Sequence, residues 1–185
     1  MSAPHDSLRL LARALDQVGD LLVHVHDDQL GDPTPCGDWD VAQLVGHLVR
    51  GVRQFTASAH GERPDWTTPP EPITGERVST FRSAADDLLH AWHQAGDAAN
   101  EQAIDWQATE LALHGWDLAR ATGRPTDRLD AEVAERGLAF ARSGLTPENR
   151  GESFGPPVDV PDTAPVVDRL AAWAGRDPGV TGLPA

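Results

Sequence analysis

The sequence contains no lysine, no tyrosine and a single cysteine, Cys36. One cysteine excludes an internal disulfide, and the N-terminus lacks the succession of charged, apolar and small residues that directs secretion. No run approaches the roughly 18 consecutive apolar residues that suggest a membrane-spanning helix. We therefore expect a cytoplasmic protein that does not insert into a membrane.

Positive charge is also scarce, because 15 arginines face 29 aspartates and glutamates and leave a formal net charge of −14. Such a charge repels phosphate backbones, so we expect no nucleic-acid partner. The use of arginine in place of lysine at all 15 positions resembles the usage in GC-rich genomes such as those of actinobacteria. At 185 residues the chain has the length of one ordinary domain, and we expect a single domain over residues 1–185.

Apolar residues recur at alternating steps of three and four through four long segments, which is the pattern of amphipathic helices. Stretches rich in proline and glycine separate these segments and predict loops, as at 31–37 and 61–76. The four apolar stripes run over Leu8–Val25, Val41–Phe55, Val78–Ala95 and Ile104–Thr122.

The start of the second helix is clearly marked. Asp40 is followed three residues later by Gln43, a variant of the capping box, and Trp39 is placed to contact Leu44. This helix is therefore expected to begin at about residue 41 and to end near His60.

The C-terminal third predicts less regular structure. Shorter helices are expected over 129–143 and around 166–173, with an irregular proline- and glycine-rich segment between them. Together the patterns predict an all-α fold: a four-helix bundle whose core helices lie within about 7–123, followed by an extension, 124–185, with additional short helices.

Candidate metal ligands occur on the fourth helix. Glu110 and His114 are four residues apart, so they lie one turn apart on the same face and both side chains can reach one ion. Asp117 follows on the same stripe, where it can orient His114 as a hydrogen-bond acceptor. Such a pair is also common on solvated helix faces, so spacing alone leaves both interpretations open.

His47 lies on the flank of the second stripe, where a lone histidine is more often a hydrogen-bonded core residue than a ligand. Two imidazoles and one carboxylate from two bundle helices would nevertheless form a ligand set for Zn, Ni, Fe or Mn and leave a coordination position open. Open positions are typical of catalytic metal sites.

Two segments resemble a known family: residues 34–48, TPCGDWDVAQLVGHL, and residues 110–123, ELALHGWDLARATG. They are similar to the actinobacterial metal-binding branch of the DinB-like superfamily, which includes the N-terminal domain of mycothiol-dependent maleylpyruvate isomerase. The tail segments 154–158 and 176–178 resemble the same branch, so the likeness extends over nearly the whole chain. The position of Cys36 in this pattern favours a structural role.

This resemblance implies a four-helix bundle that holds one divalent metal, with Zn expected first and Ni, Fe or Mn as alternatives. The family's ligands fall on His47, Glu110 and His114 of this sequence. Members with known activity use mycothiol or bacillithiol in isomerisation, conjugation or transfer, so the resemblance implies a thiol-dependent transferase or isomerase acting on a small electrophile, with mycothiol as co-substrate.

Two departures from the family limit what carries over. Here only about ten residues, 96–105, connect the third and fourth helices, where a longer connection is expected. The isomerase also has an additional C-terminal domain that contributes to its active site, and this sequence ends before one, so we do not expect maleylpyruvate isomerisation.

Two other functions use the same residues: a metal-dependent hydrolase, and a non-catalytic metal or ligand binder. A concave, partly apolar cavity beside the ligands would favour an enzyme, whereas a closed site would favour a binder. Dimerisation stays open, because no single apolar face stands out. Five tryptophans are candidates for a cavity wall, although each is more typical of a core: Trp39, Trp66, Trp92, Trp106 and Trp116.

Overall fold

A computed structural model describes residues 3–37, 39–66, 68–69, 71–73, 75–150 and 154–180. Over these residues it has helices and no strand, apart from an isolated bridge between Pro33 and Asp40. The all-α prediction is therefore confirmed. The α-helices are α1 (Ala3–Val23), α2 (Val41–Ala59), α3 (Arg77–Ala95), α4 (Glu101–Ala121), α5 (Ala131–Gly144) and α6 (Val166–Trp173). Short 3-10 helices are η1 (Asp27–Gln29), η2 (Gly96–Ala98) and η3 (Thr126–Arg128).

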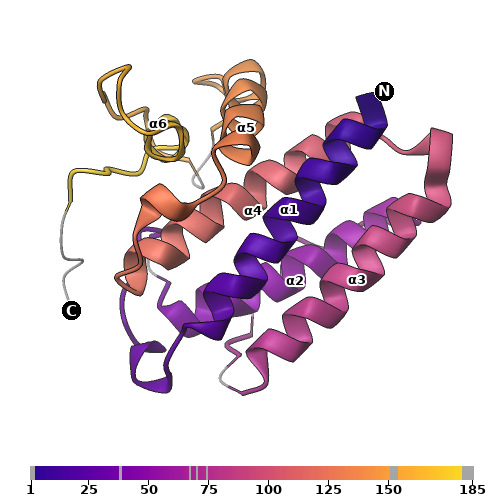
Figure 1. Cartoon of the computed structure of the whole chain (residues 1–185), viewed down its shortest axis with the longest axis horizontal. Helices are drawn as coiled ribbons and strands as arrows, with labels where there is room; N and C mark the ends of the chain where they lie inside the picture. Colours follow the sequence, from indigo (N-terminus) through magenta and orange to yellow (C-terminus); the bar gives the residue numbers. More distant parts are fainter. Residues whose placement is uncertain are drawn as a thin grey trace.

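The four long helices form the bundle (Figure 1). Helix α1 packs on α4 and α3, while α2 packs on α3 and α4. Helix α5 lies beside α4, and α6 packs against α5. The segment after the bundle therefore covers α4, the helix that carries two of the candidate ligands.

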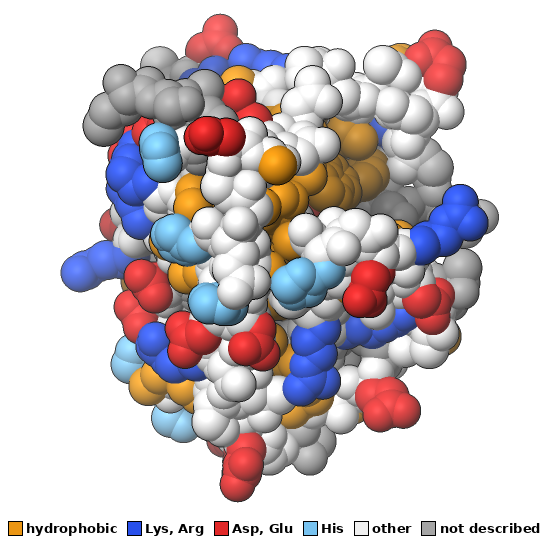
Figure 2. Space-filling model, turned by 90° about the vertical axis from the view of Figure 1, so that its right-hand side faces the viewer, with side chains coloured by type: hydrophobic (Ala, Val, Ile, Leu, Met, Phe, Trp, Pro, Cys, Tyr) orange, Lys and Arg blue, Asp and Glu red, His pale blue; other side chains and the backbone are white. Residues whose placement is uncertain are grey.

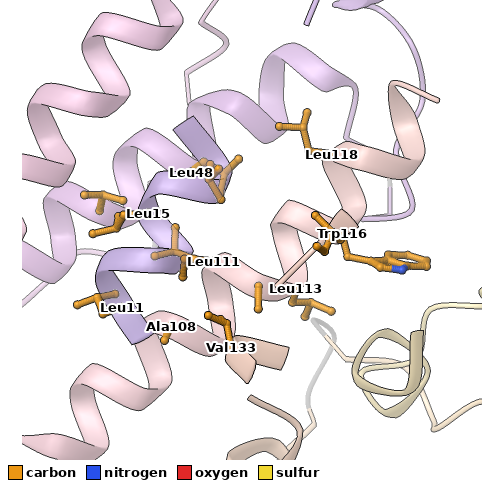
Figure 3. Packing of buried hydrophobic residues seen from close by; sticks show 14 of the residues in the cluster. Leu11, Leu15, Leu48, Ala108, Leu111, Leu113, Trp116, Leu118 and Val133 are labelled. Carbon is orange, nitrogen blue, oxygen red and sulfur yellow. The ribbon is translucent and has the colours of Figure 1, made fainter. Parts of the chain in front are cut away.

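The core lies where the apolar stripes of the bundle helices meet, as Figure 3 shows. Leu11 is fully buried and Leu15 nearly so, and both face Leu111 of α4. Helix α4 is apolar over more than one face, because it packs on the other bundle helices and also on α5 and α6. Its position in the centre of the molecule explains why polar side chains on it are buried.

The helix boundaries follow local capping interactions. At the start of α2 the Asp40 side chain accepts a hydrogen bond from the Gln43 backbone N–H, and the Gln43 side chain accepts one from the Asp40 N–H. The predicted capping box is therefore confirmed. Helix α4 begins at Glu101, three residues before the predicted stripe, because the Asn100 side chain caps it by accepting from the Ala103 N–H.

The connection between α2 and α3 passes very close to α2. The Ile73 N–H donates to the Ala42 carbonyl oxygen, and a Cβ built on Gly46 would lie 2.0 Å from the Glu71 carbonyl oxygen. Only glycine leaves room for the backbone at this point, one residue before His47. Gly46 therefore holds the connection against the helix that carries a candidate ligand.

The surface carries charges of both signs. Figure 2 shows acidic, arginine and histidine side chains interspersed over one face, around a strip of hydrophobic side chains. Among the residues described, no helix is both long enough and apolar enough to cross a membrane.

Candidate metal centre

The structure brings the three predicted ligands together. His47 on α2 and Glu110 and His114 on α4 each offer a donor atom, and these atoms all lie within 4.8 Å of one another. The Nε2 atom of His114 and the Oε2 atom of Glu110 are 3.5 Å apart. His47 and Glu110 are half-buried, while His114 is only 6 % exposed. Their ligand role remains a prediction.

Helix geometry accounts for this convergence. The capping box fixes where α2 begins, and the direct packing of α2 on α4 then brings His47 alongside α4. On α4 the four-residue spacing stacks Glu110 under His114. The capping box of α2, the four-residue spacing on α4 and the contact between the two helices therefore bring the triad together.

The two imidazoles are held by aromatic contacts. The His47 ring meets the His114 ring edge to face, with ring centroids 4.6 Å apart. The Trp39 indole also packs on His47, with ring centroids 4.6 Å apart, and its centroid lies 6.4 Å from that of His114. Both imidazoles are thus restricted in rotation before any ligand binds.

Asp117 lies where the sequence analysis expects an acceptor for His114. Its Oδ2 atom is 3.0 Å from Nδ1 of His114, and its side chain is fully buried. A hydrogen bond from Nδ1–H to this carboxylate orients the ring so that Nε2 faces Glu110. The role of Asp117 in metal binding remains a prediction.

No local pattern in the sequence gives Arg176 a role, yet this arginine completes the chain of contacts behind His114. It follows α6 in the chain, is 7 % exposed, and donates to Asp117 through Nε and Nη2. The resemblance of residues 176–178 to the family's tail marks the position of Arg176 but does not indicate its contact with Asp117.

Burial and neighbouring charges shift the pKa values of the two histidines in opposite directions. Burial, reinforced by repulsion from His114, lowers the pKa of His47 to about 3. Burial also opposes protonation of His114, but hydrogen bonds to Asp117, Cys36 and Glu110 prevail and raise its pKa well above 6.5. His47 is therefore neutral near pH 7, with a free nitrogen lone pair.

Both carboxyl groups are stabilised in the ionised form. Burial favours the protonated carboxyl, but the hydrogen bond from His114 and the charges of His114 and Arg176 lower the pKa of Glu110. The same hydrogen-bond donor and the Arg176 charge lower the pKa of Asp117 despite its burial. An anionic oxygen of Glu110 is therefore available to a cation.

A second donor set shares His114 and adds Cys36 and Asp117. The Cys36 sulfur lies 3.7 Å from Nη2 of Arg176, and Asp117 is ion-paired to the same guanidinium. A fixed positive charge beside two of its three donors disfavours a cation there. Of these two sets, the one with His47 and Glu110 is the better metal centre.

A cavity of about 560 Å³ opens beside the triad. Its walls are partly apolar, and the segments 154–155 and 174–176 form one side of it. Trp39 and Trp106 also line it, whereas Trp92 and Trp116 are buried in the core. Trp66 is half exposed and lines a second, much smaller pocket beside the same triad. The full lining is Pro35, Cys36, Gly37, Trp39, His47, Trp106, Glu110, His114, Phe154, Gly155, Ala174, Gly175 and Arg176.

The donor set fits a divalent metal. Ligand atoms at 2.0–2.1 Å from a tetrahedral ion lie about 3.3–3.4 Å from one another. The separation of 3.5 Å between His114 Nε2 and Glu110 Oε2 is close to this value. Two imidazoles and a carboxylate are ligands that Zn²⁺ and its neighbours in the first transition series accept.

The fold and these donors define an all-α bundle with a candidate metal centre. Residues 11–119, more than half of the chain, match the family described as the mycothiol maleylpyruvate isomerase N-terminal domain. The chain belongs to this family, and the resemblance seen in the sequence is confirmed.

Relatives in Mycobacterium tuberculosis match almost end to end. The uncharacterized protein Rv0738 of strain H37Rv is 33 % identical over 187 residues, which cover 92 % of this chain and 98 % of the relative. The uncharacterized protein MT0763 of strain CDC 1551 matches with the same identity and coverage. No solved structure gives a significant match.

Proposed function

We propose that this protein is a metal-dependent transferase or isomerase that acts on a small electrophile. It either joins a low-molecular-weight thiol, mycothiol, to the electrophile or isomerises the electrophile with mycothiol as co-substrate. The observation that carries the proposal is the convergence of the His47, Glu110 and His114 donor atoms on the wall of a cavity of about 560 Å³. Membership of a family described by a mycothiol enzyme domain supports the choice of thiol.

The three ligands have distinct tasks in this proposal. Neutral His47 and ionised Glu110 offer lone pairs, and the contact with Asp117 directs Nε2 of His114 toward them. Three protein ligands leave a further coordination position toward the cavity, as in catalytic zinc sites. A divalent ion there, Zn²⁺ first and Ni, Fe or Mn as alternatives, supplies a Lewis acid that lowers the pKa of a thiol.

The cavity walls suit a small organic substrate. Trp39, Trp106 and Phe154 offer flat apolar surfaces that can hold a substrate and exclude water from it. The Trp106 and Phe154 rings meet edge to face, with centroids 6.4 Å apart, so the bundle and the C-terminal segment meet at this wall.

The open cavity also bears on the alternatives. A non-catalytic metal store needs no concave, aromatic-lined space beside its ion, so this cavity favours an enzyme. A hydrolase in which the metal activates water would use the same three ligands. The thiol titration below separates the hydrolase from the thiol enzyme.

The test is metal analysis of purified protein together with its His47→Ala, His114→Ala and His90→Ala variants. His90 is an exposed histidine on α3, away from the triad, and serves as the matched control. We expect near-stoichiometric metal in the wild type and in His90→Ala, and its loss in the other two. Metal retained by both triad variants, or absent from the wild type after loading, contradicts the proposed site.

The thiol is tested on the cobalt-substituted protein. Mycothiol should change the visible absorption of the bound cobalt, because sulfur replaces a weaker ligand, whereas S-methyl mycothiol should leave it unchanged. Full metal occupancy with no response to mycothiol contradicts thiol dependence and favours the hydrolase or the non-catalytic binder.

A further inference from the structure

The segment after α6 reaches into the metal centre through one side chain. Arg176 lies 59 residues beyond Asp117, and its guanidinium holds both oxygens of that carboxylate: Nε is 3.3 Å from Oδ1 and Nη2 is 3.2 Å from Oδ2. Its Nη1 donates to the Ala174 carbonyl oxygen at 3.1 Å, which fixes the guanidinium to the backbone of its own segment. Such a two-point contact fixes the plane as well as the position of a carboxylate.

The same carboxylate touches His114. Oδ2 of Asp117 accepts from Arg176 on one side and lies 3.0 Å from Nδ1 of His114 on the other. The direction of the His114 ring, and with it the position of Nε2, therefore depends on a carboxylate that the C-terminal segment holds. Asp117 and Arg176 are both buried, so water cannot replace Arg176 as the hydrogen-bond donor to the Asp117 carboxylate.

The segment is itself anchored independently of Arg176. Arg150, also buried, donates through Nη1 to the carbonyl oxygens of Gly155 and Trp173. A Cβ built on Gly175 would lie 2.6 Å from the Cα atom of Gly155, so the two strips of backbone are in close contact. Arg150, which follows α5, therefore ties Gly155 to the end of α6 through contacts that do not include Asp117 or the triad.

From this arrangement we propose that Arg176 is a positioning residue for the metal ligand His114. It fixes the Asp117 carboxylate, Asp117 fixes the imidazole, and the C-terminal segment thereby becomes part of the metal centre although it lies outside the family match at 11–119. The inference rests on the proposed function, because it requires metal bound by His47, Glu110 and His114.

The experiment compares Arg176→Met with Arg150→Met, since both remove a buried guanidinium that donates to the backbone at the end of α6. Zn²⁺ affinity is measured by competition with a chromophoric chelator, and the cobalt-loaded proteins are compared by visible absorption. Arg176→Met should lose about tenfold or more in affinity, as removal of groups that orient a ligand does, and should shift the cobalt bands. Arg176→Lys should recover part of the affinity, and Arg150→Met should keep both affinity and spectrum.

The outcomes separate this inference from the proposed function. Wild-type protein that binds no metal contradicts the proposed function itself. Metal binding by the wild type with unchanged affinity and spectrum in Arg176→Met overturns only the role of Arg176. An equal loss in Arg150→Met also overturns it, because general loosening of the segment would then explain the effect.

A second comparison applies if Arg176→Met fails to fold. Asp117→Asn removes the carboxylate charge, and the double variant with Arg176→Met removes both charges together. If Arg176 acts only through Asp117, the double variant should bind Zn²⁺ within about twofold of Asp117→Asn. A further tenfold loss in the double variant overturns the proposal.

Discussion

Two glycines of α2 offer a matched test of how closely the α2–α3 connection packs on this helix. Gly46 and Gly51 are both buried in its middle. A Cβ on Gly46 would lie 2.0 Å from the Glu71 carbonyl oxygen and 2.9 Å from its carbonyl carbon, whereas a Cβ on Gly51 would meet no atom within 4 Å. Replacing each with alanine changes the same helix by the same group.

The difference in stability follows from these distances. Alanine favours the helix over glycine by about 1 kcal/mol at either position, so this effect cancels in the comparison. At Gly46 the Glu71 oxygen must withdraw by about 1.4 Å to reach the 3.4 Å of ordinary contact. Overpacking of this kind costs about 1–3 kcal/mol. Gly51→Ala should therefore be the more stable variant by about 1–3 kcal/mol.

The assay is urea unfolding of both variants and the wild type, followed by tryptophan fluorescence and by circular dichroism. Limited proteolysis after Glu62 with a glutamate-specific protease reports whether the connection has moved away from α2, because Glu62 lies exposed in that connection. We expect Gly51→Ala to be at least as stable as the wild type, and Gly46→Ala to unfold at lower urea and be cut faster. Equal unfolding free energies and equal cleavage of the two variants would refute the reasoning.

Three further predictions concern charge, capping and the core. Arg9 and Arg13 lower the pKa of Glu132 from 4.5 to about 2, so the stabilisation by this carboxylate should be present above pH 4.5 and lost as pH falls toward 2. The difference in unfolding free energy between wild type and Glu132→Gln should shrink as pH falls through that window. It should also shrink at high salt, because these groups are exposed. A difference that does not change with pH contradicts this prediction. Asp40→Ala should destabilise by about 1 kcal/mol in urea unfolding, while Asp40→Ser should largely keep the cap; equal stability of the two contradicts the cap. Phe81→Ala empties a fully buried site and should cost about 3–5 kcal/mol in the same assay; a loss below 1 kcal/mol contradicts tight packing there.

Much of the fold was predictable because its determinants are local. The start of α2 depends on a side chain and a backbone N–H three residues apart, and α6 coincides with the predicted stretch 166–173. Apolar periodicity places the start of α4 three residues too late, because it does not register the cap at Asn100. The residues at a helix end are fixed by side chains that hydrogen-bond its unpaired backbone groups. The spacing of apolar residues carries no information about these bonds.

The site was predictable only in part. The spacing of Glu110 and His114 is a local signal, but their partner on α2 came from the family pattern. Arg176 could not be assigned from the chain, because its contact with Asp117 depends on how α5 and α6 pack on α4. The same holds for Trp39 and Trp106, which line the cavity while Trp92 and Trp116 are buried.

Three buried ionisable side chains lie together where stability alone gives little reason for them. His114, Asp117 and Arg176 are each less than 10 % exposed and form one continuous chain of contacts. Burying such groups has a desolvation cost that their attraction offsets only partly, and apolar residues of similar volume are often as stable or more so. A chain of this kind that ends at an imidazole facing a carboxylate and a second imidazole therefore supports the proposed role of His114 as a ligand more than a role in folding the bundle.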